Sequence, residues 1–309
     1  MNKKFLLVVF LSIGIVTIAI ITQIHPRNIP QPSDKISVAT SFYPLAYLAQ
    51  QIGGSYVSVI NITPAGVEPH DFEPTPRDIN NIYKSQLFIF NGGGIDSWAE
   101  KIQPNLEAQG IKTINMLSEA KRQSPILEST NPHLWLDPTI MSQEADMVTD
   151  LLIRIDSAHA QEYNSNREKL KKELAKLDTE YQLGLSNCQL REIITSHDAF
   201  GYLAVRYNFK IASILGISPE EEPSPKKIAE ISALAKSKGV KYIFFETMVS
   251  PKLSETIASE IGAKTLVLDP IEGLPEQDSK DNQNYLTLMQ QNLANLETAM
   301  LCQPNQSSK

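Results

Sequence analysis

Three of the five histidines in this chain lie where α/β proteins commonly hold a ligand. His70 lies in a loop that follows an expected strand and is stiffened by prolines. His133 lies in the segment NPHLWLDP, residues 131–138, and His197 comes just after another expected strand. Asp269 stands at the matching place after the last expected strand. Ligands of open α/β sheets bind beyond the carboxyl ends of the strands, so these four residues are the candidates for chemistry.

The chemistry that these four side chains suit is coordination of a metal ion. Three imidazoles and one carboxylate can form a tetrahedral Zn²⁺ site, since zinc binds histidine nitrogen and carboxylate oxygen at similar distances. Glu68 and Asp71 flank His70 and could coordinate, orient its ring by hydrogen bonding, or face solvent; the last two roles are favoured. For the fourth ligand, Glu68 and a water molecule stay open beside Asp269. Spacing alone also leaves open that the histidines are structural loop residues, because it assumes a fold that gathers distant loops.

The hydrophobic pattern predicts an α/β fold. Short β-rich segments alternate with helical ones in each half of the chain, which indicates two small lobes, each with a mostly parallel sheet. The expected strands are 36–41, 56–62, 87–91 and 111–115 in the first half, and 192–195, 210–214, 241–246 and 265–268 in the second. The expected helices of the first half are 44–52, 77–84 and 96–107, and Gly53-Gly54 ends the first of them.

A long helix is expected between the two halves. Residues 157–185 hold no proline and no glycine before Gly184, and apolar residues recur along them every three, four or seven positions. This stripe predicts one helix, roughly 43 Å long at 1.5 Å per residue, that runs along both lobes as a rigid connector. The expected domains are a lobe at 35–155, a linking helix at 156–186, a lobe at 187–303 and a tail at 304–309.

The N-terminus predicts the compartment. Lys3 and Lys4 precede an uncharged, mostly apolar run at 5–24 that is long enough to cross the hydrocarbon layer of a membrane. Lysines on the leading side predict that the rest of the chain lies outside the cytoplasm, in the periplasm or cell envelope. We predict a signal peptide or, slightly favoured, an uncleaved anchor at 1–24, since no good small-x-small cleavage site follows the run. Residues 25–34, with three prolines, would form an extended tether.

Composition narrows the classes of function. A formal net charge of −7 has the wrong sign for a protein that neutralises phosphates, so nucleic acid is excluded as the main partner. Two cysteines exclude a zinc site built from four cysteines. Cys188 and Cys302 bracket the second lobe and could pair in an oxidising compartment, with two buried thiols as the alternative. The Gly92-Gly93-Gly94 run matches neither phosphate-loop pattern and predicts a tight turn.

A set of motifs in the correct order resembles the metal-binding solute receptors of bacterial ABC importers, the zinc- and manganese-binding group. The motifs are GVEPHDFEPTP at 66–76, NPHLWLDP at 131–138, TSHDAFGYLA at 195–204, ISPEEEPSP at 217–225, the segment 241–270, and the long central helix. The resemblance covers the chain from about Lys35 to Cys302. It implies two α/β lobes bridged by a rigid helix, a metal site in the cleft between them, and delivery of the metal to a membrane permease with a cytoplasmic ATPase.

Carried over residue by residue, the family's metal ligands fall on His70, His133, His197 and Asp269. The resemblance implies the zinc-type (ZnuA-like) branch, since manganese-binding members place a carboxylate where this chain has His197. A nitrogen-rich site also binds zinc more tightly than manganese in the Irving–Williams order. The expected protein is an extracytoplasmic, monomeric receptor for Zn²⁺ that meets the membrane only through its N-terminal segment and is not an enzyme. It departs from many zinc receptors of the family in that residues 117–129 hold no histidine.

Three other functions stay open. Mn²⁺ is the alternative metal for the same kind of receptor. A zinc-dependent hydrolase would also use three histidines, with an open fourth position for water, but the chain has no HExxH motif and Glu68 is the only obvious base beside a ligand. A surface adhesin is the third alternative, and the sequence indicates no exposed apolar patch that would support it.

Overall fold

The computed structural model describes residues 35–123, 131–219, 221–274 and 283–303. The predicted signal or anchor at 1–24, the tether at 25–34 and the tail at 304–309 lie outside these residues. The chain from Ile36 onward clusters into one compact unit. Within the described ranges, every helix is too short or too polar to cross a bilayer.

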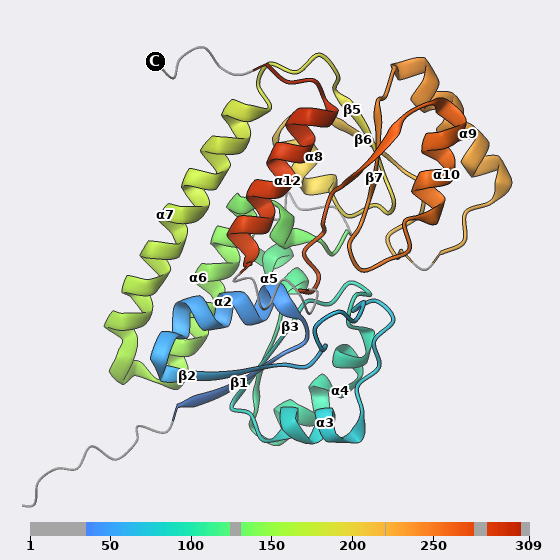
Figure 1. Ribbon diagram of the computed structural model, residues 1–309. Coiled ribbons are helices and arrows are strands. Elements are labelled where there is room, and N and C mark those ends of the chain that lie inside the picture. Colours follow the sequence, from blue (N-terminus) through green and yellow to red (C-terminus); the bar gives the residue numbers. More distant parts are fainter. Residues whose placement is uncertain (1–34, 124–130, 220, 275–282, 304–309) are drawn as a thin grey trace, which may run out of the picture. The chain divides into compact units, whose positions relative to one another are not determined.

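Two parallel four-stranded sheets form the frame of this unit (Figure 1). The first sheet contains β1 (Ile36–Thr40), β2 (Val57–Asn61), β3 (Leu87–Phe90) and β4 (Lys112–Asn115), in the order β2-β1-β3-β4. The second contains β5 (Glu192–Thr195), β6 (Lys210–Ser213), β7 (Tyr242–Phe245) and β8 (Lys264–Val267), in the order β6-β5-β7-β8. We call the parts around these sheets the first and second lobes. The predicted α/β fold with two parallel sheets is confirmed, and each predicted strand end lies within one residue of the observed one.

Local sequence signals explain where helices of the first lobe begin and end. α2 (Tyr43–Gly53) has Pro44 in its first turn and ends at Gly54, whose φ of 55° favours glycine. α3 (Pro76–Tyr83) begins with a capping box, in which the side chains of Thr75 and Asp78 each accept the other's backbone N–H. The remaining helical elements of this lobe are η1 (Gly54–Tyr56), α4 (Ser97–Ala108), α5 (Met116–Gln123), η2 (Leu134–Leu136) and α6 (Pro138–Ile155).

The predicted linking helix is α7 (Ala160–Gly184), with 25 residues. It begins later than predicted because 157–159 form a separate 3-10 turn, η3 (Ser157–His159). Its apolar stripe is buried, as the periodicity predicts, and consists of Tyr163, Leu170, Leu174, Leu177 and Tyr181. α7 packs against α6 and α2 of the first lobe and against α12 (Tyr285–Ala299) of the second, so it runs along both lobes (Figure 1).

One hydrophobic core continues from the first lobe into the second. A single buried cluster includes Leu45 of α2, Val148 of α6, Leu174 of α7 and Leu296 of α12. Smaller clusters lie between the first sheet and α3 and α4, and between the second sheet and the helices α9 (Pro225–Lys238) and α10 (Lys252–Ile261). The short helix α8 (Gly201–Arg206) follows β5. The main core therefore crosses from lobe to lobe. The predicted boundaries between the first lobe, the linking helix and the second lobe stay predictions.

A disulfide joins Cys188 to Cys302. It links the chain just after α12 to the segment between α7 and β5, across a sequence separation of 114 residues. In the chain-entropy model a loop of this length contributes about 4.7 kcal/mol by restricting the unfolded chain. The cross-link thus fastens the last helix of the second lobe next to the end of the long helix.

Glu144 is an ionisable side chain that α6 buries without a partner. Its exposed fraction is 0%, and neither carboxylate oxygen has a hydrogen-bond partner among the described residues. Burial raises the pKa of Glu144 to about 8. The carboxyl group is therefore protonated at neutral pH, where an exposed glutamate would be ionised.

We expect Glu144→Met to stabilise the protein, most strongly in alkaline solution. The folded-state pKa of this carboxyl lies above its usual value of 4.5, so the folded state holds the proton more tightly and loses stability as the pH rises from 4.5 toward 8. At about 1.4 kcal/mol per pKa unit, a shift from 4.5 to about 8 makes this loss on the order of 5 kcal/mol. Denaturant unfolding of both proteins at about pH 5 and about pH 8.5 measures the difference.

The control for this experiment is Asp150→Asn, on the exposed side of the same helix. It should leave the dependence of stability on pH unchanged. If Glu144→Met and the parent protein lose stability in parallel as the pH rises, the carboxyl of Glu144 is not the group that titrates.

Candidate metal centre

The three predicted histidines come together with one glutamate. His70, His133, His197 and Glu272 each present one ligand atom, and these four atoms lie within 4.8 Å of one another. His70 follows β2, His197 follows β5 and Glu272 follows β8, so three of the four come after the carboxyl end of a parallel strand. His133 directly precedes η2, which leads into α6. The side chains of His133, His197 and Glu272 are fully buried, and that of His70 is 5% exposed.

A hydrogen bond behind each of two rings fixes which nitrogen faces the cluster. Nδ1 of His133 lies 2.7 Å from Oδ1 of Asn131, and Nδ1 of His197 lies 2.5 Å from Oε1 of Glu246. Both partner atoms are acceptors, so the hydrogen-bond network assigns a proton to each Nδ1. In the neutral form of either ring, Nε2 then carries a lone pair that points into the cluster.

These lone pairs and a carboxylate converge. Oε1 of Glu272 lies 2.9 Å from Nε2 of His133 and 3.5 Å from Nε2 of both His70 and His197. The Nε2 atoms of His133 and His197 are 3.2 Å apart. Nε2 of His70 and Oε2 of Glu272 are buried without a hydrogen-bond partner in the described part of the chain. Acceptor atoms this close repel one another unless a cation lies between them, so the cluster fits a metal ion.

Burial and charge act in opposite directions on the protonation of the cluster. Burial lowers the pKa of His133 to about 4. Burial also opposes the charged form of His197, but the carboxylates of Glu246 and Glu272 prevail and hold its pKa well above 6.5. Although Glu272 is fully buried, the three histidines around its carboxylate hold its pKa well below its usual range. Burial and the charge of Glu272 raise the pKa of Glu68 to about 9, so Glu68 is protonated at neutral pH.

Asp269, the fourth predicted ligand, lies outside the cluster, and Glu272 takes the place predicted for it. Oδ1 of Asp269 accepts the backbone N–H of Ile271 at 2.7 Å, and Oδ2 accepts the hydroxyl of Thr247 at 2.6 Å. Both oxygens therefore shape the turn after β8, in which Ile271 has a positive φ of 58°. The sequence analysis chose Asp269, the first carboxylate after the strand. In the structure the turn instead places the second carboxylate, that of Glu272, in the cluster.

The two acidic residues beside His70 do not hold its ring in the described structure. Oε1 of Glu68 accepts the backbone N–H of His70 at 3.1 Å, so this side chain holds the loop. Asp71 is exposed. The residues that do hold ligand rings, Asn131 and Glu246, were missed by sequence reasoning. Glu246 stands directly after β7, at the same kind of position that selected the other candidates.

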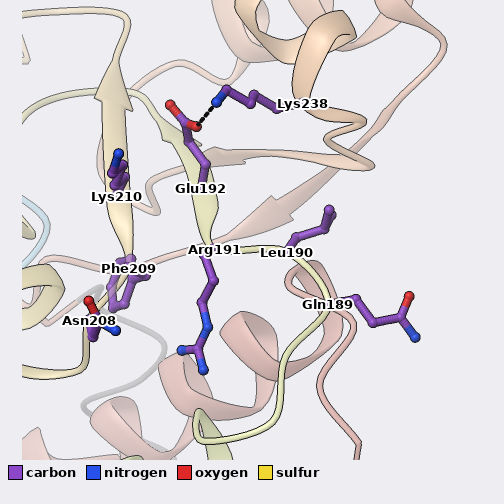
Figure 2. Close-up of a pocket in the computed structure, with 8 residues that line it drawn as sticks. All are labelled: Gln189, Leu190, Arg191, Glu192, Asn208, Phe209, Lys210 and Lys238. Atoms are coloured by element: carbon purple, nitrogen blue, oxygen red, sulfur yellow. Dashed lines mark ion pairs between the residues drawn. The ribbon is translucent and has the colours of Figure 1, made fainter.

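A cavity of about 380 Å³ lies at the other end of the second sheet, next to the starts of β5 and β6 (Figure 2). Three cationic side chains line it, those of Arg191, Lys210 and Lys238. They do not point to one place: Lys238 pairs with Glu192 at 3.2 Å, and the guanidinium of Arg191 points away from that pair (Figure 2). The cavity thus lacks the convergence of side chains that distinguishes the histidine cluster.

Two parallel α/β lobes that share a buried ligand cluster define the class of two-lobed solute-binding proteins. Comparison with known proteins identifies the family within this class. Residues 38–299 match the family model described as "Zinc-uptake complex component A periplasmic", and the chain belongs to this family. As predicted, this is a family of zinc-uptake receptors rather than of enzymes.

Individual relatives are similar over most of this chain. The high-affinity zinc uptake system protein ZnuA of Bacillus subtilis is 34% identical over 283 residues, which cover 87% of this chain and 88% of that protein. The zinc-binding protein AdcA of Streptococcus pyogenes is 31% identical over 319 residues, which cover 96% of this chain but only 61% of that protein. The solved Zn(II)-bound ZnuA-like domain of Streptococcus pneumoniae AdcA aligns with a TM-score of 0.76 and 31% identity, over 86% of this chain and 99% of that one.

We expect Glu272→Gln to weaken Zn²⁺ binding by more than about tenfold, because the amide keeps the shape of the side chain but removes the charge that faces the metal. Asp269→Asn should weaken binding less, since Asp269 acts only through the turn. Competition titration against a chelator of known affinity measures both variants. Asp71→Asn, at the exposed acid beside His70, is the control and should leave the affinity unchanged. A larger loss for Asp269→Asn than for Glu272→Gln would restore Asp269 as the ligand.

Proposed function

We propose that this protein captures Zn²⁺ outside the cytoplasm and delivers it to an ABC-type membrane permease with a cytoplasmic ATPase. The proposal rests on one observation. One ligand atom from each of four residues lies within 4.8 Å of the others, and these residues are the proposed ligands: His70, His133, His197 and Glu272. The zinc-uptake family and the zinc-binding relatives support the same function.

The ligand set favours Zn²⁺ over the alternative metal, Mn²⁺. Three imidazole nitrogens and one carboxylate oxygen suit tetrahedral zinc, whereas manganese prefers sites that are rich in oxygen and six-coordinate. A nitrogen-rich site also ranks zinc above manganese in the Irving–Williams order. The replacement of Asp269 by Glu272 in the cluster leaves this argument unchanged, because either residue supplies one carboxylate.

The carboxylates around the cluster favour a divalent cation. Glu272 and Glu246 contribute negative charge, whereas burial and the charge of Glu272 keep Glu68 protonated at neutral pH. Burial raises the pKa of the nearby Asp269 to about 6, so this carboxylate is also ionised at neutral pH. Unpaired buried charge costs several kcal/mol, so a doubly charged cation is favoured beside these carboxylates.

Zinc would tie the two lobes together. His70 and His133 belong to the first lobe, and His197 and Glu272 to the second, so the bound ion adds metal–ligand bonds on both sides of the interface. At 100 times the dissociation constant, binding stabilises the folded state by about 2.7 kcal/mol. The loaded protein is thus distinguishable, by its closed interface and its stability, from the empty one.

The compartment and the partners of this proposal rest on the N-terminal sequence and on the family. The segment 1–24 would export the chain and either be cleaved or stay as its only contact with the membrane. The family description itself names the periplasm. A monomer suffices, because one chain supplies all four proposed ligands.

We expect metal-free protein to bind Zn²⁺ at least about 100-fold more tightly than Mn²⁺, in keeping with the nitrogen-rich ligand set. Competition titration near pH 7.5 gives the ratio, and elemental analysis of protein purified without added metal gives the ion carried from the cell. His197→Glu should narrow the ratio, since it exchanges an imidazole for an oxygen ligand. Equal affinity for the two ions in the parent protein would favour a manganese receptor.

We expect zinc binding near pH 7 to release about one proton, from His197. The pKa of His197 is raised, so its Nε2 is protonated at this pH and zinc must displace that proton; affinity therefore falls as the pH falls. His133, with a pKa of about 4, is already neutral and releases none. Calorimetry in buffers of different ionisation enthalpy counts the protons. Glu246→Gln should lower the number of protons released. An unchanged number in this variant would contradict the assignment of the proton to His197.

A further inference from the structure

The side chain of Asn131 bonds to a ligand histidine with one end and to the opposite lobe with the other. Its Oδ1 accepts the backbone N–H of His133 at 3.1 Å and the ring Nδ1–H of the same residue at 2.7 Å. Its Nδ2 donates to the carbonyl oxygen of Asp198 at 2.7 Å. Asp198 directly follows His197, so this amide spans the short distance between a ligand of the first lobe and the ligand loop of the second.

The two ends of a carboxamide cannot be oriented independently, because the group is planar and rigid. If Asn131 turned its amide over, the oxygen would face the carbonyl of Asp198 and the NH₂ group would face two N–H groups of His133. An acceptor would then face an acceptor at Asp198, and donors would face donors at His133, so neither hydrogen bond could form. The N–H groups of His133 and the carbonyl of Asp198 therefore select together the orientation in which Oδ1 holds Nδ1–H of His133 and leaves Nε2 free for the metal.

We propose that Asn131 is a positioning residue that couples contact between the lobes to zinc coordination by His133. While the lobes are in contact, Asp198 holds the amide and the amide holds the imidazole in the tautomer that binds metal. When the ligand loops part, the bond to Asp198 is lost, the amide loses one of the partners that fix its orientation, and its hold on the metal-binding tautomer of the ring weakens. This inference rests on the proposed zinc-receptor function and adds how the receptor would release its ion.

Only a small movement is needed for this coupling. A bond of 2.7 Å between Nδ2 and the Asp198 carbonyl is lost when the two atoms move apart by about 1 Å. A partner that pulled on either ligand loop could therefore weaken the hold on His133 before the lobes separate widely. Loss of a residue that orients a ligand histidine commonly costs about 10- to 100-fold in metal affinity.

Two substitutions at Asn131 separate its contact with His133 from its contact with the second lobe. Asn131→Ala removes the side-chain bonds to His133 and to Asp198, and should speed zinc dissociation by about 10- to 100-fold. Asn131→Asp keeps an oxygen for the Nδ1–H of His133 but puts a second oxygen against the Asp198 carbonyl. Its added negative charge would by itself hold Zn²⁺ more tightly, so faster dissociation from this variant reports the lost contact with the second lobe.

The matched control is Tyr202→Phe. The hydroxyl of Tyr202 in α8 donates to the backbone carbonyl of Asn131 at 2.9 Å, so it joins the same two segments without touching the His133 ring. This variant should lower the melting temperature of the zinc-free protein and change the zinc dissociation rate by less than about threefold. A residue that acted only through general stability would change both quantities in every variant.

The experiment measures zinc dissociation into excess chelator by stopped flow for the full-length parent protein and the three variants, together with the melting temperature of each zinc-free form. The ¹⁵N shifts of His133 in zinc-free protein report its tautomer, which should be the Nδ1–H form in the parent and a mixture in Asn131→Ala. The inference is overturned if Asn131→Asp releases zinc no faster than the parent, or if Tyr202→Phe speeds release as much as the Asn131 variants. Failure of the parent itself to bind zinc would instead overturn the proposed function.

Discussion

Electron-pair donors that face one another inside a protein repel, and holding four of them together is the constraint on which this structure depends. The repulsion could be relieved if a ring exchanged its tautomer and presented an N–H group in place of a lone pair. Asn131 and Glu246 prevent this, because each engages the Nδ1 atom behind a ligand ring. In the metal-free protein Nε2 of His197 instead takes up a proton, which Zn²⁺ would displace on binding.

The repetition of one sheet topology is what brings the donors to one place. In both sheets the strand that comes first in sequence lies second in the order, and loops after the carboxyl ends of the strands carry three of the four clustered residues. Two hydrogen bonds then fix the first lobe's η2 segment against the second lobe, one to the turn after β8 and one to the start of α12. Nε1 of Trp135 donates to the carbonyl of Pro270 at 2.7 Å, and the hydroxyl of Tyr285 donates to the carbonyl of Trp135 at 2.6 Å. His133 and Glu272 lie next to these bonds in the chain.

The strands and three of the four clustered residues were predictable from sequence because their signals are local. Parallel strands with both faces covered give short apolar runs, and the loops that follow two such runs hold His70 and His197 at the ligand-binding edge of the sheet. Glu272 was not predictable in this way, since its direction depends on a turn that Asp269 shapes together with Thr247, 22 residues earlier in the chain. Asn131 depends on a carbonyl 67 residues away, a pairing that exists only in the folded protein.

A shared core limits how such a receptor can open. Swinging the lobes widely apart would expose the apolar cluster that α2, α6, α7 and α12 bury together, at about 25 cal/mol for each Å² exposed. Separating the lobes at the outer edge of the site would expose less apolar surface, because residues 64–67 are already exposed there. The contact at this edge includes a hydrogen bond from the backbone N–H of Gly66 to the carbonyl of Leu274 at 3.0 Å. His70 is carried by this loop and is the least buried of the four clustered residues. Movement confined to the ligand loops could therefore free His70 first and then disturb Asn131, which lets the ion leave without the cost of opening the core.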